Sequence, residues 1–128
     1  MKLNKEDKEL INKTYDFIRN CKFKSTGMGA GLTTSNGNLF FGCSLSVECP
    51  AAVCAEPIAI GQMIVSGESK IDTIVAVYYN GKIYPPCGCC RELMSGIGIG
   101  NPWVIINKTS KLKLKDLLPK SNLRFIEE

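Results

Sequence analysis

Residues 54–66 read Cys-Ala-Glu-Pro-Ile-Ala-Ile-Gly-Gln-Met-Ile-Val-Ser, and residues 86–92 read Pro-Cys-Gly-Cys-Cys-Arg-Glu. The first stretch is apolar on nearly every side and predicts a buried helix, with Pro57 in its first turn, where a missing N–H costs little. The second follows Pro85-Pro86 and predicts a helix from Cys87 to about Ser95. The sequence therefore predicts two helices that each begin at a cysteine.

The segments on either side of these helices predict the other elements. Asn4 is a suitable cap for an amphipathic helix that opens with acidic residues. Strands are expected at 27–34, 39–45, 71–79, 103–107 and 111–114, the first two joined by a turn at 35–38. The order helix, hairpin, helix, strand, helix, strand, strand predicts a three-layer α-β-α domain over residues 1–128. Its five-stranded mixed sheet should end in two antiparallel strands, because so few residues join them.

Length and composition indicate one globular domain. The chain has 128 residues, of which 45% are hydrophobic, and carries a net charge of +4 without any histidine. A general acid or base must therefore be Glu, Asp, Lys or Cys, and a transition-metal site must depend on cysteine. The lysines at 108, 111, 113 and 115 favour a solvated edge over a nucleic-acid surface, since no aromatic residues alternate with them.

The seven cysteines are irregularly spaced, which argues against a disulfide framework. Residues 1–10, MKLNKEDKEL, have no apolar signal core, and no apolar run is long enough to cross a membrane. We therefore expect a cytoplasmic protein without membrane contact. Grouped cysteines in that compartment indicate metal binding or catalysis.

Helical spacing selects the cysteines that could share a metal. Positions 87 and 90 lie on one face of a helix, whereas 87 and 89 point apart, and Cys54 can complete a set of three. Three thiolates with one open position is the ligand count of a catalytic zinc site. Two helix N-termini and Arg91 would offset the net negative charge of such a centre. Glu56 lies too close to Cys54 to be an easy fourth ligand, but it could move a proton to and from water.

Two other interpretations remain open for these cysteines. A closed structural zinc site would use Cys49 or Cys89 as a fourth ligand, and it would leave Glu56 without a role. A redox dithiol formed by Cys87 and Cys90 would leave Cys54-Ala55-Glu56 unexplained.

The spacing of Cys-Ala-Glu and Pro-Cys-x-x-Cys resembles that of the cytidine deaminase superfamily, particularly the small enzymes that act on free nucleosides and the related blasticidin S deaminases. The resemblance covers roughly residues 5–120. Further similar stretches are Gly29-Ala30-Gly31-Leu32, Asn36-Gly37, Phe41-Gly42-Cys43, Arg91-Glu92 and Leu117-Leu118-Pro119.

The resemblance implies zinc-dependent hydrolytic deamination of a cytosine nucleoside or analogue. Cys54, Cys87 and Cys90 match the zinc ligands, Glu56 matches the proton shuttle, and the Ala55 N–H would lie near the base carbonyl. It also implies a homotetramer and a small-molecule substrate in place of nucleic acid.

This chain departs from the family pattern at the sugar pocket. Ser44-Leu45-Ser46 stands where cytidine deaminases carry Asn-x-Glu, and two hydroxyls cannot replace a carboxylate's charge-assisted bonds. Ser44 and Ser46 are nevertheless the expected substrate contacts there. Three functions remain open: a cytidine-type deaminase, a blasticidin S deaminase, and a zinc-binding protein of this fold without turnover.

Overall fold

The computed structural model describes residues 1–22, 27–46, 52–96 and 98–118. Its helices are α1 (Lys5–Arg19), α2 (Ala55–Val65) and α3 (Gly88–Gly96), and a 3-10 turn spans Leu114–Leu117. Its strands are β1 (Met28–Thr34), β2 (Leu39–Cys43), β3 (Ile71–Tyr78), β4 (Ile83–Tyr84), β5 (Trp103–Ile105) and β6 (Lys111–Lys113). No helix in this part of the chain combines the length and apolar character needed to cross a bilayer.

The sheet has the predicted mixed character. Its main path is β2-β1-β3-β5-β6, in which β3 and β5 are parallel and the last pair, β5 and β6, is antiparallel. The expected strand count of five is corrected to six, because the two-residue strand β4 pairs with β3 beside the main path. Two residues are too few to give a detectable alternating pattern, so only the fold reveals this strand.

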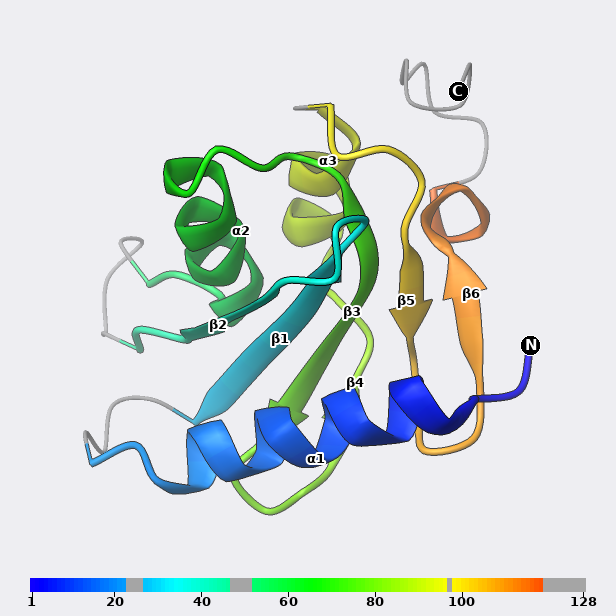
Figure 1. Cartoon of the computed structure of the whole chain (residues 1–128). Coiled ribbons are helices and arrows are strands. Elements are labelled where there is room, and N and C mark those ends of the chain that lie inside the picture. Colours follow the sequence, from blue (N-terminus) through cyan, green and yellow to red (C-terminus); the bar gives the residue numbers. More distant parts are fainter. Residues whose placement is uncertain (23–26, 47–51, 97, 119–128) are drawn as a thin grey trace.

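Helices cover both faces of the sheet, which gives three layers (Figure 1). Successive residues of β3 point to opposite faces. Ile74 packs in one apolar cluster with Met63 of α2 and Met94 of α3. Its neighbour Val75 packs in a second cluster with Leu10 of α1. The two cysteine-bearing helices therefore lie together on the face opposite α1.

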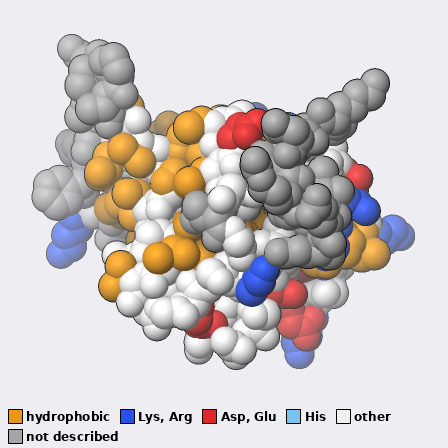
Figure 2. Space-filling view, turned by 90° about the horizontal axis from the view of Figure 1, so that it is seen from above, with side chains coloured by type: hydrophobic (Ala, Val, Ile, Leu, Met, Phe, Trp, Pro, Cys, Tyr) orange, Lys and Arg blue, Asp and Glu red, His pale blue; other side chains and the backbone are white. Residues whose placement is uncertain are grey.

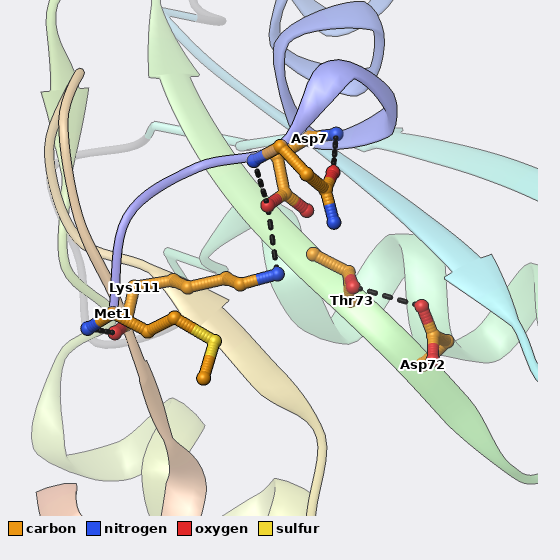
Figure 3. A network of polar contacts seen from close by, with 6 residues as sticks. Met1, Asp7, Asp72, Thr73 and Lys111 are labelled. Atoms are coloured by element: carbon orange, nitrogen blue, oxygen red, sulfur yellow. Dashed lines mark hydrogen bonds and ion pairs between the residues drawn. The ribbon is translucent and has the colours of Figure 1, made fainter.

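A buried ion pair joins the start of α1, where Asn4 and Asp7 form a capping box, to the edge strand β6 (Figure 3). Asp7 accepts a hydrogen bond from the Asn4 backbone N–H and lies 2.7 Å from the Lys111 ammonium, with both charged side chains about 5% exposed or less. Lys111 is therefore an exception to the expected solvated edge, whereas Lys108 and Lys115 of the same cluster are exposed as expected. A sequence pattern cannot show this pairing, because the partner residue lies more than 100 positions away in the chain.

Helix α2 is less buried than its apolar sequence predicts. Its inner face contributes Ala59, Ile60 and Met63 to the core. At its end, however, Ile64 is 43% exposed and Val65 is 87% exposed. The sheet covers only one side of the helix, so these two apolar side chains remain exposed.

Gly42 allows β2 to approach α2 closely, and this contact sets the position of the helix that follows Cys54. A Cβ at Gly42 would collide with the backbone nitrogen of Ala59 and lie 2.8 Å from the carbonyl oxygen of Ala55. Backbone atoms cannot move aside as a flexible side chain can.

We therefore expect Gly42→Ala to lower the free energy of unfolding by about 1–3 kcal/mol. The matched control is Gly61→Ala within α2, where an added Cβ has no heavy atom within 4 Å. That change should stabilise the fold by about 0.5–1 kcal/mol, because alanine restricts the unfolded chain. Urea denaturation of both variants measures the difference, and equal stabilities would contradict the close approach.

Candidate active site

Three cysteine thiols meet where the N-termini of α2 and α3 converge. Cys54 is the N-cap residue of α2, Cys87 directly precedes α3, and Cys90 lies in the first turn of α3. The Sγ atoms of Cys54 and Cys87 are 3.5 Å apart, and those of Cys87 and Cys90 are 3.4 Å apart. All three Sγ atoms lie within 4.8 Å of one another.

This donor set fits zinc. Zn–S bonds of about 2.3 Å in a tetrahedral site place the sulfur atoms about 3.8 Å apart, close to the observed separations. The Cys54 thiol makes no capping hydrogen bond to its helix, so it is available as a ligand. In the part of the chain that the structure describes, no fourth metal-binding side chain joins the group, and Cys89 stays outside it. Cys49, the other proposed fourth ligand, lies outside the described residues.

The environments of the three thiols differ. Burial tends to raise the pKa of Cys87, but hydrogen bonds involving the Cys90 backbone and the neighbouring thiols outweigh it and lower the pKa overall. Burial, followed by the charge of Glu56, raises the pKa of the Cys90 thiol. Burial also raises the pKa of Cys54. Cys87, at the start of α3, is thus the thiol of the three that most readily becomes a thiolate.

Glu56 is buried beside the thiol cluster. Its side chain is 5% exposed, and its Oε1 lies 3.8 Å from the Sγ of Cys90. Burial raises the pKa of this carboxyl group above its usual value. A carboxyl group whose pKa is raised toward neutrality can both accept and return a proton, which is the requirement for a shuttle.

Arg91 makes contacts that helical spacing does not foresee. Its guanidinium group donates hydrogen bonds to the carbonyl oxygens of Pro86, at 2.9 Å, and of Leu117, at 3.2 Å. The side chain therefore ties the segment before Cys87 to the 3-10 turn. Through these bonds Arg91 positions the backbone that carries Cys87, in addition to the charge that the sequence led us to expect near the thiols.

A pocket of about 350 Å³ opens beside the thiols and Glu56. All three residues expected to contact substrate line it: Ser44, Ser46 and Ala55. The Ser44 hydroxyl oxygen already accepts hydrogen bonds from the backbone N–H groups of Gly27, at 3.3 Å, and Met28, at 3.1 Å. Ser44 therefore holds the start of β1 in place and retains only its O–H as a donor.

Two further lining residues, Met28 and Tyr84, lie outside the motifs; the sequence left Tyr84 open between packing in the core and lining a pocket. Nothing local marks them, because each is a strand residue whose neighbours are also apolar. They reach the pocket only through the pairing of β1 and β4 with β3.

The chain was compared with known proteins. Residues 4–106 match the family model of the cytidine and deoxycytidylate deaminase zinc-binding region. The chain is 32% identical over 104 residues to a blasticidin-S deaminase of Bacillus cereus, covering 72% of this chain and 74% of that protein. It is 41% identical over 66 residues to a cytidine deaminase of Mycoplasma genitalium, covering 49% and 50% respectively.

The fold has solved counterparts. A crystal structure of cytidine deaminase from Mycobacterium tuberculosis has a TM-score of 0.77 and 20% sequence identity, covering 90% of this chain and 95% of that chain. The family match spans both cysteine motifs, and the three thiols that it contains form a cluster of the size that zinc requires. The chain therefore belongs to the zinc-dependent cytidine and deoxycytidylate deaminase family.

Proposed function

We propose that this protein is a zinc-dependent hydrolase that removes the amino group of a cytosine nucleoside or a cytosine-containing analogue and releases ammonia. The observation that carries this proposal is the position of Glu56. Its buried carboxyl group lies next to the thiol cluster and also lines the pocket. A purely structural zinc site has no use for such a group.

Cys54, Cys87 and Cys90 would hold the zinc. When bound, zinc acidifies water and so supplies a nucleophile near neutral pH. In the reaction, a water oxygen forms a bond to C4 of the base, and the bond between C4 and the exocyclic amino nitrogen breaks. Glu56 accepts the proton from water, delivers it to the ring nitrogen, and assists the departure of ammonia. The N–H of Ala55, at the first position of α2, would bind the carbonyl oxygen of the base.

The sugar side of the pocket favours a substrate other than plain cytidine. Glu56 is the only carboxylate among the described lining residues, and it faces the thiols. The hydroxyl groups that face the sugar are those of Ser46 and Ser44, and Ser44 can only donate its O–H. The similarity to the blasticidin-S deaminase of Bacillus cereus makes blasticidin S, itself a cytosine compound, the second candidate substrate.

A substrate panel tests the proposal. We expect the zinc-loaded protein to release ammonia from at least one of cytidine, 2′-deoxycytidine and blasticidin S, with loss of the cytosine absorbance band. The matched negative control is Glu56→Gln. If neither protein releases ammonia from any of the three, the deaminase function is wrong and a zinc-binding protein without turnover remains.

We further propose that residues 1–128 act as one deaminase-like domain, that the chain assembles as a homotetramer, and that it works in the cytoplasm. Hydrophobic side chains gather on the face seen in Figure 2, and the exposed end of α2, Ile64 and Val65, supplies apolar surface for a contact between subunits. The free thiols of the candidate metal centre suit a reducing compartment.

A further inference from the structure

We infer that Tyr84 is a substrate-binding residue of the candidate site, where its ring forms the aromatic wall against which the cytosine ring packs. This inference rests on the proposed function. It concerns a residue that the two cysteine motifs do not include.

Tyr84 reaches the pocket through the short strand β4. It pairs with Ala76 of β3, and both residues line the pocket. The small side chain of Ala76 leaves space beside the larger ring. Cys87, three residues further along the chain, lines the same pocket.

Two residues that do not line the pocket contact the Tyr84 ring. The ring of Tyr78 meets it edge-on, with centroids 6.1 Å apart and planes at 83°. The Lys82 ammonium lies 5.2 Å from its centroid. The side chain nonetheless remains 38% exposed. A tyrosine that only filled the core would be buried, so this ring combines a fixed orientation with an available surface.

The chemistry of the wall suits a planar base. Among the described lining residues, Tyr84 is the only aromatic one, and its neighbours there are aliphatic or small. Aromatic rings gain from offset or edge contact with another π-system, and every base has such a face. Tyr84 and Cys87 line the same pocket and are three residues apart in sequence, so we assign this contact to the reacting base and not to the sugar.

The test compares Tyr84→Leu and Tyr84→Phe with the parent protein. We expect Tyr84→Leu to raise KM about three- to tenfold, by the same factor for every cytosine compound that the parent deaminates, with kcat changed less than about twofold. Tyr84→Phe keeps the ring and should behave like the parent. The matched control is Tyr79→Leu: Tyr79 packs on Tyr78 at 4.5 Å but does not line the pocket, and KM should not change.

Zinc content and the thermal midpoint of each variant identify structural damage. An unchanged KM in Tyr84→Leu overturns the inference. So does a rise limited to one compound, which indicates a sugar contact, or a loss of zinc, which indicates a structural role.

Binding of uridine and 2′-deoxyuridine to the zinc-loaded proteins, measured by calorimetry, separates this inference from the proposed function. Weaker binding of these two pyrimidines by Tyr84→Leu than by the parent supports the inference, even if no ammonia is released and the proposed function fails. Equal binding by both proteins, or none by the parent, overturns it.

Discussion

Replacing Glu56 with Gln is expected to lower the rate of ammonia release by at least about 100-fold, and by as much as about 10⁴-fold. The amide has nearly the same shape as the carboxyl group but cannot take a proton from water. Because the side chain is buried beside Cys90, bulk water cannot easily replace it as the proton carrier. Steady-state kinetics on the best compound of the panel measures kcat.

Two controls separate a loss of proton transfer from a loss of zinc and from a general effect of removing a carboxylate. Zinc content should stay near that of the parent, because Glu56 is not one of the clustered ligands. Glu9→Gln removes the same charge from an exposed position on α1, on the opposite face of the sheet, and should leave kcat within about twofold. If Glu56→Gln works as fast as the parent, Glu56 has no part in proton transfer.

Single substitution of Cys54, Cys87 or Cys90 by Ser is expected to remove most of the bound zinc and nearly all ammonia release. A serine hydroxyl is a far weaker zinc ligand than a thiolate, and a site with three protein ligands has none to spare. Elemental analysis of purified protein should give about one zinc per chain for the parent and a small fraction of that for each variant.

Cys89→Ser is the matched control for this experiment. Cys89 lies in the same turn of α3 between two ligand positions, yet it is exposed and outside the thiol cluster. This variant should keep both zinc and activity. Loss of zinc from Cys89→Ser would instead indicate a closed four-cysteine site and would remove the basis for catalysis.

Local rules predicted most elements and the composition of the metal centre. The cap at Asn4, the helical period of apolar residues in α1 and the antiparallel pairing of β5 with β6 all follow from short-range geometry. Helical spacing selected Cys87 and Cys90 over Cys89 for the same reason: residues three apart share a helix face, and those two apart do not.

The pocket walls could not be predicted in this way. Ser44 is predicted as a substrate contact, but its hydroxyl is engaged by the backbone of Gly27 and Met28, 17 and 16 residues away. Tyr84 enters the pocket because a two-residue strand joins the sheet. Such contacts depend on the register of strand pairing, which is decided by packing across the whole sheet and leaves no local pattern.

The sequence by itself therefore determined the order of the elements and two local motifs, Cys54 with Glu56 and Cys87 with Cys90, because each motif lies within one helical turn. Only the tertiary structure decided that Cys54 meets Cys87 across 33 residues, that Arg91 reaches the carbonyl oxygen of Leu117 across 26 residues, and that Lys111 is buried against Asp7. The physical reason is distance along the chain. Local conformational preferences act between near neighbours, whereas these contacts form only when the sheet brings distant segments together.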